Sequence, residues 1–469
     1  MDGAAATEMP RTESAPVRAG LSWQVFALAW PVLALNSLVL LVEISDRYLV
    51  GNLAGADAIQ SRDMLAAQAT AHYVAWFISS YTVLVSVGAT ALVARFVGAR
   101  DFGLASRATH QAILLAAIVG LIGSVVVVAA LRPFVGVLGL SGAAAECAVT
   151  YLRPMFLLLT FRVVEMAGVA SLVGAGDTRT GLWVQGGIAA INVPLAWTLC
   201  RGIGSFQGLG FVGVSLGTAL SYLLGCVAVL IVLFRGRAGL KLHMAGFRPD
   251  WSLMRRLLRV SLPAGADSLS VVAGQMWFVH IVNGLGTIAA SAHGIALVWE
   301  ALGYLSGHAF GTAAMTLVGQ NLGARRPDRA SRAGWTAFAL GCGVMTFMGA
   351  IFFTFAPSLF APFCRQPGQE AVIDAGVPVL RLVAFAMPAL ASTMIFTAAL
   401  RGAGDTRVPV LFTWIGFLVV RIPLAYLLTS DAVGWGLFGA WTAMSADLFV
   451  RGAFFYSRFA GGKWKQTIV

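Results

Sequence analysis

Six acidic residues lie inside the long apolar stretches of this 469-residue chain. Two of them, Glu165 and Asp447, have an arginine at helical spacing, Arg162 and Arg451, with which we expect them to pair. The other four are Glu43, Asp46, Asp267 and Glu300. A carboxylate in a hydrocarbon environment costs free energy, so such acids mark ion or proton pathways by default. Glu43 and Asp46 are three residues apart and share one helical face, on which Arg47 can pair with Glu43. Because Glu300 has no partner in its apolar run, we expect it to be protonated at neutral pH, as a proton carrier requires.

Two prolines precede these acids on the same stretches. Pro31 lies fifteen residues before Asp46, and Pro263 lies one helical turn before Asp267. Proline lacks a backbone N–H and weakens the helix around it. We therefore interpret Pro31 and Pro263 as hinges in helices that carry acids.

The composition predicts the elements that hold these residues. Hydrophobic residues make up 58% of the chain and charged residues 11%, whereas soluble domains carry roughly 25% charged residues. Runs of about 20 apolar residues are long enough to span a membrane. We expect twelve spans, near residues 22–49, 67–94, 109–131, 149–172, 181–200, 209–234, 258–283, 291–320, 333–356, 376–399, 408–429 and 435–457. The fold class is thus an all-α integral membrane protein.

An internal repeat divides the chain into two parts. L-V-G-A-G-D-T-R at 172–179 returns as L-R-G-A-G-D-T-R at 400–407, 228 positions later. G-A-R at 98–100 and A-S-R-A at 105–108 return at 323–325 and 330–333, and P-L-A at 194–196 returns at 423–425. Six spans per repeat is an even number, so the two lobes are parallel and related by a pseudo-two-fold axis along the membrane normal. In the G-A-G-D-T-R copies we expect a glycine turn in which the aspartate (Asp177 or Asp405) or the threonine after it caps the next helix.

Charge predicts the topology. If both termini are cytoplasmic, the loops and tails on that side carry 22 Lys and Arg residues and the opposite side carries seven, as the positive-inside rule requires. We expect a multi-pass protein of the cell (inner or plasma) membrane. Its predicted parts are a disordered cytoplasmic tail (1–20), an N-lobe (21–234), a cytoplasmic linker loop (235–257), a C-lobe (258–459) and a second tail (460–469). The arginines of the loop either set this topology or bind anionic lipid headgroups.

Together, several motifs resemble the multidrug and toxic compound extrusion (MATE) family. They are W-P-V-L-A-L-N at 30–36, D-R-Y-L-V-G at 46–51, G-A-T-A-L-V-A-R-F-V-G-A at 88–99 and the two G-A-G-D-T-R copies. The resemblance covers about residues 21–459. It implies two bundles of six helices, alternating access driven by proton or sodium entry, and organic cations as exported substrates.

The resemblance also implies site residues. Asp46 stands where the family has a cation- or proton-binding aspartate, and Asn192 and Thr218 are its companions in spans 5 and 6. A sodium ion at Asp46, Asn192 and Thr218 suits the preference of hard cations for oxygen ligands. One bacterial branch has a second aspartate four residues after the asparagine, where this chain has Ala196. A salt bridge from Asp46 to Arg47, and plain interhelical hydrogen bonds for Asn192 and Thr218, are the alternatives.

The second lobe offers further coupling candidates. Several branches of the family use acids in the two helices that hold Asp267 and Glu300, although Asp267 is displaced by about a turn, and another family acid aligns with Leu390. Glu300 as a neutral acid bonded to a neighbouring helix remains open. Coupling through Asp46, through Asp267 and Glu300, or through both is compatible with the sequence, and so are protons and sodium.

Aromatic and methionine side chains in the spans suit flat organic cations. The candidates for a substrate cleft are Trp76, Tyr81, Met276, Trp277, Trp299, Tyr304 and Met394. The predicted function is an antiporter that exports amphipathic organic cations in exchange for protons or sodium. It acts as a monomer in contact with membrane lipid, without a cofactor. The alternative is a flippase for a lipid-linked precursor. No hydrolase, metalloprotease or phosphate-loop motif supports an enzyme, and the scattered basic residues argue against nucleic acid.

Overall fold

The computed structural model describes residues 20–51, 58–137, 142–364 and 369–467. These residues are almost entirely helical. The α-helices are α1 (Leu21–Gly51), α2 (Ala58–Gly98), α3 (Phe102–Ala129), α4 (Leu131–Val137), α5 (Gly142–Leu157), α6 (Leu159–Gly174), α7 (Thr178–Arg201), α8 (Phe211–Arg235), α9 (Trp251–Gly284), α10 (Thr287–Gly323), α11 (Pro327–Phe360), α12 (Glu370–Gly402), α13 (Arg407–Trp414), α14 (Ile422–Thr429) and α15 (Gly436–Ala460). A hairpin, β1 (Gly202–Ile203) and β2 (Phe206–Gln207), was not predicted, nor were the short 3-10 helices η1 (Met244–Gly246), η2 (Ala361–Phe363) and η4 (Lys463–Gln466).

The expected twelve spans are present. Within the described ranges, nine spans are long and apolar enough to cross a membrane, and α5 with α6 forms a tenth that is bent by 50°. The more polar α9 and α15 complete the set. The bend divides the predicted span 149–172, one turn after Pro154, whose missing N–H weakens the helix there. The eleventh span runs from α13 into α14 through a seven-residue π-helix, η3 (Ile415–Arg421).

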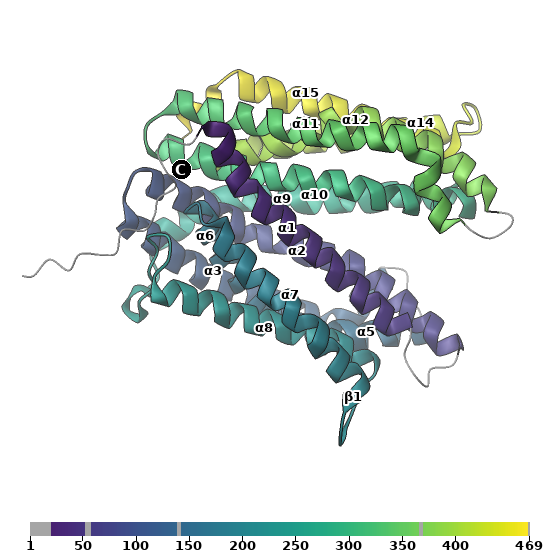
Figure 1. Cartoon of the computed structure of the whole chain (residues 1–469), viewed down its shortest axis with the longest axis horizontal. Helices are drawn as coiled ribbons and strands as arrows, with labels where there is room; N and C mark the ends of the chain where they lie inside the picture. Colours follow the sequence, from purple (N-terminus) through teal and green to yellow (C-terminus); the bar gives the residue numbers. More distant parts are fainter. Residues whose placement is uncertain (1–19, 52–57, 138–141, 365–368, 468–469) are drawn as a thin grey trace, which may run out of the picture.

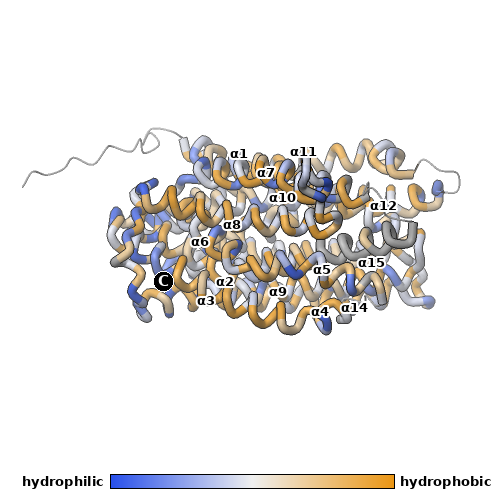
Figure 2. Tube along the Cα trace, turned by 90° about the horizontal axis from the view of Figure 1, so that it is seen from below, coloured by the Kyte–Doolittle hydropathy of each residue, from blue (hydrophilic) through white to orange (hydrophobic). Residues whose placement is uncertain are grey.

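Hydropathy varies along the length of the helices. In Figure 2, hydrophobic residues occupy most of the helix length and hydrophilic residues gather toward the two ends of the molecule. The C-terminus lies at the same end as the loops that follow α2, α6, α8, α10 and α12 (Figure 1). We call this the turn end.

Four helices at the turn end stop in the same way. Two residues after each helix comes a residue with positive φ: Arg100 (61°), Gly176 (92°), Arg325 (56°) and Gly404 (84°). The next residue then donates its N–H to a carbonyl five residues back, in the pairs Asp101–Phe96, Asp177–Leu172, Arg326–Asn321 and Asp405–Leu400. This is the Schellman arrangement, in which glycine is favoured because the left-handed region is costly for other residues. The repeated sequences therefore encode repeated helix ends.

The two aspartates of the repeat play different parts. Asp177 caps α7, because its Oδ1 accepts the backbone N–H of Thr180 at 2.9 Å, and it also pairs with Arg237 at 2.8 Å. Asp405 pairs with Arg458 of α15 at 2.8 Å, and the following helix has no side-chain cap. The predicted capping is thus confirmed for Asp177 and is wrong for Asp405.

The first helix of each half packs against both halves. Leu28, Ala29 and Val32 of α1 are buried in the hydrophobic core of the second half, and Leu257 and Val260 of α9 are buried in the core of the first. Figure 1 shows α1 crossing diagonally from the α11 side at the turn end toward α5 at the other end. The halves are therefore interlocked at the turn end.

The last residues fold back onto the second half. Trp464 of η4 is fully buried, stacks on Phe459 with ring centroids 4.7 Å apart, and donates to the Phe459 carbonyl. The predicted tail 460–469 is thus held in place as far as Thr467. The predicted tail 1–20 lies outside the described residues, apart from Gly20.

Candidate functional site

In the first half, three predicted site residues meet where α1, α7 and α8 come together. The Thr218 hydroxyl donates to Oδ2 of Asp46 at 3.4 Å, and the amide of Asn192 donates to Thr218 at 3.4 Å and to Ser221 at 3.3 Å. Asp46 and Asn192 are buried, with 9% and 3% of their surfaces exposed. The predicted Glu43 lies on the same helix, but its side chain is outside the described part of the structure.

The geometry of this cluster suits a small cation. The distance of 3.4 Å between the Thr218 hydroxyl and Oδ2 of Asp46 is long for a hydrogen bond. Oxygen atoms that share a hard cation at about 2.4 Å stand about 3.4 Å apart when they subtend a right angle. Asn192 turns its amide nitrogen toward Thr218, and its carbonyl oxygen is buried and accepts no hydrogen bond among the described residues. The cluster therefore offers a carboxylate and a hydroxyl oxygen at the spacing of cation ligands, with an unused amide oxygen on the neighbouring Asn192.

Close helix packing explains the departure at Ala196. A Cβ on Gly217 of α8 would lie 2.7 Å from the Ala196 Cα of α7, and Ala196 is fully buried. An aspartate at 196 would have no room without moving α8 away from Asn192. The first-half cluster is thus built around one described carboxylate, that of Asp46.

The second half has a different polar centre, formed by charged residues. Asp447 of α15 accepts from Arg421 at 2.7 Å and from Arg451 at 2.6 Å, and Arg421 also donates to the side-chain oxygen of Gln275 of α9 at 2.9 Å. All three charged side chains are buried. The predicted Asp447–Arg451 pair is confirmed, and Asp447 is the acid that Arg421 meets.

The π-helix of span 11 positions Arg421. Arg421 is its last residue, and the Phe417 ring within it lies 4.4 Å from the Arg421 guanidinium and 4.9 Å from that of Arg451. A Cβ on Gly416 would collide with the Asp447 carboxylate. A π-helix has wider turns than an α-helix. Here the π-helix brings the backbone at Gly416 against Asp447 and places the Phe417 ring beside both arginines.

The two predicted coupling acids of the second half also lie near arginines. Asp267 is 3% exposed and accepts from Arg401 of α12 at 2.6 Å. Glu300 is partly exposed, and its charged neighbour is Arg421. Glu300, Tyr304 and His308 follow one another at four-residue spacing along one face of α10. Arg401 is the residue at which the repeated L-R-G-A-G-D-T-R departs from L-V-G-A-G-D-T-R, so that departure was the available signal for its pairing.

The MatE family profile matches residues 31–198 and 263–427, most of both halves. The chain belongs to the MatE family. It is therefore a membrane transporter and not an enzyme.

Curated MatE relatives span the whole chain at low identity. A probable multidrug resistance protein NorM of Thermotoga maritima is 27% identical over 98% of this chain and 96% of its own length. An uncharacterized transporter of Bacillus subtilis, YisQ, is 24% identical, with 95% of each chain covered. Another probable NorM, from Rhodopseudomonas palustris, is 28% identical over 92% of this chain and 90% of its own.

Solved structures share the MatE fold. A MOP superfamily transporter from Pyrococcus furiosus, described as having a binding pocket of reverse polarity, matches with a TM-score of 0.85 at 20% identity, covering 95% of this chain and 97% of its own. An outward-facing multidrug resistance MATE transporter matches with a TM-score of 0.84 at 21% identity and the same coverage. Both likenesses support the two-lobed, twelve-helix architecture.

The MatE repeat makes the two polar centres equivalent. N-V-P-L-A at 192–196 returns as R-I-P-L-A at 421–425, so Arg421 stands in the place of Asn192. G-L-G-F-V-G at 208–213 returns as G-W-G-L-F-G at 434–439, which places Asp447 opposite Ser221. Phe278 follows Pro263 by the same fifteen residues as Asp46 follows Pro31, and its ring lies 5.7 Å from Arg421. The sequence interpretation missed this equivalence, although the repeated P-L-A pointed to it.

The predicted cleft residues fall into two groups. Trp76, Met276, Trp277 and Tyr304 are exposed by 40%, 37%, 47% and 45%. The other three make packing contacts: Tyr81 donates to the Val119 carbonyl at 2.7 Å, Met394 packs against Gly307, and the Trp299 ring meets Phe363 edge-on. The first group retains the accessibility that a ligand needs.

The predicted Arg162–Glu165 pair is confirmed, with 2.9 Å between Nη1 and Oε2. Histidines at the starts of spans 2 and 8, His72 and His293, could in principle relay protons. The His72 side chain lies outside the described part of the structure, and His293 is buried between the Phe278 and Trp441 rings. This packing accounts for His293 without a relay.

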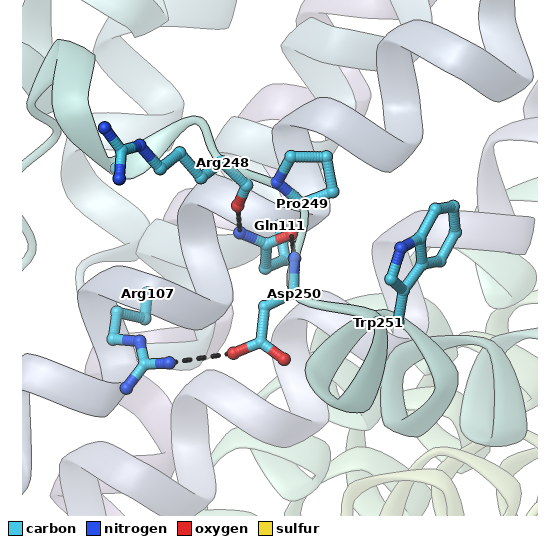
Figure 3. A pocket seen from close by; sticks show the side chains of 7 residues that line it. Arg107, Gln111, Arg248, Pro249, Asp250 and Trp251 are labelled. Atoms are coloured by element: carbon cyan, nitrogen blue, oxygen red, sulfur yellow. Dashed lines mark hydrogen bonds and ion pairs between the residues drawn. The ribbon is translucent and has the colours of Figure 1, made fainter.

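The linker loop encloses a pocket of about 480 Å³ at the turn end, lined by Arg107, Gln111, Gly246, Arg248, Pro249, Asp250 and Trp251. Figure 3 shows Arg107 reaching the Asp250 carboxylate, which caps α9, while the Gln111 amide bridges the loop backbone. The N–H of Leu253, together with Arg107, holds the pKa of Asp250 below its usual range. The contacts that line this pocket thus attach the linker loop to α3.

Proposed function

We propose that this transporter exports amphipathic organic cations in exchange for protons or sodium, and that the exchanged ion binds at Asp46, Thr218 and Asn192. The observation that carries the proposal is the buried chain of contacts from Asn192 through Thr218 to Asp46. A proton binds there by neutralising the Asp46 carboxylate. A sodium ion binds by drawing in the Thr218 hydroxyl and the Asn192 carbonyl oxygen.

The second half is a poorer place for the ion. Asp267 and Asp447 each accept hydrogen bonds from arginine, and a nearby guanidinium disfavours a second cation. Among the described acids inside the predicted second-half spans, Glu300 is the one that accepts no hydrogen bond from an arginine, and we assign it an auxiliary proton-carrying role.

Three further features support export of organic cations. The multidrug resistance names of the relatives point to small-molecule substrates. The exposed Trp76, Trp277 and Tyr304 provide aromatic faces that attract organic cations. The excess of Lys and Arg at the turn end supports a cytoplasmic location for that end. Both termini would then be cytoplasmic, and the protein would act as a monomer in the cell membrane.

The test is efflux of ethidium from proteoliposomes under an imposed pH gradient or an imposed sodium gradient. Export driven by pH alone would assign protonation as the coupling step, and export driven by sodium would assign the oxygen cluster as a sodium site. The matched control is the same protein with both gradients collapsed by ionophores. Absence of export under either gradient would contradict the proposal and favour the flippase for a lipid-linked precursor.

A further inference from the structure

The two halves bond to each other at the turn end in a pseudo-symmetric way. On α10, Gln320 donates to the Gly174 carbonyl at 2.9 Å, at the end of α6. On α2, Arg95 donates to the Ala403 carbonyl at 3.2 Å, at the end of α12. Gly174 and Ala403 lie in the first and second G-A-G-D-T-R turns. Each long helix thus reaches across to the repeated turn of the opposite half.

The acceptors are chemically suited to these donors. The last four carbonyls of a helix have no partner within the helix, and a helix C-terminus carries partial negative charge that favours a cation such as Arg95. Thr316, one turn before Gln320, donates at 3.2 Å to the preceding carbonyl, that of Val173, which also accepts the Gly176 N–H. The cross-half bonds therefore complete the helix ends that the Schellman turns leave open.

Two glycines allow the helices to come this close. A Cβ on Gly98 would collide with the Gln320 carbonyl, and a Cβ on Gly323 would collide with the Arg95 carbonyl. Both residues belong to the repeated G-A-R that ends α2 and α10. The backbones of α2 and α10 thus touch near Arg95 and Gln320. This contact holds the two side chains over the G-A-G-D-T-R turns of the opposite halves.

One difference breaks the symmetry and brings in the C-terminal segment. Arg95 also donates to the Thr467 carbonyl at 2.9 Å, and Thr467 follows the η4 turn that Trp464 holds against the second half. Among the described residues, the Gln320 side chain makes no matching bond to the C-terminal segment. The tail therefore adds a further connection between the halves, which the Arg95 guanidinium makes together with the Ala403 bond.

We propose that Arg95 and Gln320 are the gate residues of the turn end: they hold the repeated turns and the C-terminal segment across the two halves, and transport requires these bonds to break and re-form. Arg95 and Gln320 act as positioning residues that set the balance between closed and open turn ends. The assignment does not depend on which substrate or ion is carried.

The experiment measures the distance across the turn end directly. Ala99 and Ala324 are exposed and directly follow the crossing glycines, one in each half. Both are replaced by cysteine in a chain whose five native cysteines have been substituted and whose export matches that of the parent. Spin labels at the two positions then report the distance distribution in lipid nanodiscs, without substrate or gradient.

In the parent we expect one short, narrow distribution. In the Arg95→Ala/Gln320→Ala variant we expect a second, longer distance and a closed-to-open ratio that falls at least tenfold, because each lost hydrogen bond changes an equilibrium constant about fivefold. Arg332→Ala, an exposed arginine at the same end, is the control and should leave the distribution unchanged. An unchanged distribution in the double variant would overturn the proposal.

A milder variant covers the case in which the double variant folds poorly. A chain that ends at Gln466 loses the Thr467 acceptor and keeps Trp464 buried, so its ratio should fall about fivefold. If this chain behaves like the parent, the C-terminal segment has no part in the gate. Because the distances need no transport, a failure of the gate and a failure of the proposed ion site give separate results.

Discussion

In the first half, Asn192 donates to Ser221 at 3.3 Å, and the neighbouring carboxylate, Asp46, belongs to α1. At the equivalent positions in the second half, Arg421 bonds Asp447 at 2.7 Å, and a phenylalanine stands in the place of Asp46. The same helix arrangement thus holds a loose pair of neutral side chains beside a carboxylate in one half and a tight ion pair in the other.

The difference bears on where a mobile ion can act. A buried carboxylate needs a positive partner or a proton. In the second half the chain supplies the positive charge itself, as Arg421 and Arg451, whereas we propose that the first-half cluster binds an ion from solution. We therefore expect changes in the first-half cluster to alter the dependence of transport on the ion. Changes in the second-half charged centre should alter the stability of the fold instead.

The largest effect is expected from Asp46→Asn. This change removes the carboxylate but keeps the shape of the side chain, so ion-driven ethidium export should fall to the background of empty liposomes while expression is unchanged. Asp374→Asn, an exposed acid of α12, is the matched control and should export normally. Full gradient-driven export by the Asp46 variant would remove this residue from the mechanism.

Asp447→Asn should destabilise the protein without a specific effect on ion coupling. It leaves Arg421 and Arg451 buried without a carboxylate, which costs about 3–5 kcal/mol. The equivalent first-half change, Ser221→Ala, removes one neutral hydrogen bond and should cost about 1 kcal/mol. Thermal unfolding in detergent compares the two, and equal losses would contradict the contrast between the halves.

Moving the first-half pair into the second half sharpens the comparison. Arg421→Asn together with Asp447→Ser should be less destabilising than the sum of the two single changes, by about 0.5–3 kcal/mol, because Arg421 is then not left buried without its carboxylate, although Arg451 still is. The measurement is a double-mutant cycle of unfolding midpoints. Additive losses would show that the two residues do not act as a pair.

Glu300→Gln tests the auxiliary role given to the second half. If Glu300 carries a proton, the variant should export with a flatter dependence on pH across the neutral range, while retaining the requirement for Asp46. The initial rate of export as a function of internal pH is the readout. An unchanged pH profile would return Glu300 to a hydrogen-bonding role in helix packing.

The smallest effect is expected at the exposed Arg107–Asp250 pair of the linker loop. Asparagine also caps helices, so Asp250→Asn loses only a surface ion pair, worth less than about 1 kcal/mol at pH 7. Because the pKa of Asp250 is lowered by folding, its contribution is present above the unfolded value of about 3.9. The contribution disappears as the pH falls through the pKa of Asp250 in the folded protein. Unfolding midpoints of the parent and the Asp250→Asn variant should therefore differ at pH 7 and agree at a pH below that pKa.

Local patterns in the sequence predicted much of this structure. The twelve spans follow from apolar run length, the helix ends follow from G-A-G-D-T-R, and the Asp447–Arg451 and Arg162–Glu165 pairs follow from helical spacing. Contacts such as Asp267–Arg401 and Arg95–Thr467 join helices far apart in the chain. Their partners depend on how the helices pack, which spacing within one helix does not encode.

The π-helix of span 11 also records the history of the duplication. The G-A-G-D-T-R copies lie 228 positions apart, but Pro194 and Pro423 on the following helices lie 229 apart. The second half thus has one more residue than the first between these landmarks, where its helix contains the wide turn Ile415–Arg421. One residue corresponds to about 100° of rotation in an α-helix. By accommodating the extra residue in a π-turn, the chain keeps the rest of this helix in the same angular register as its counterpart in the first half.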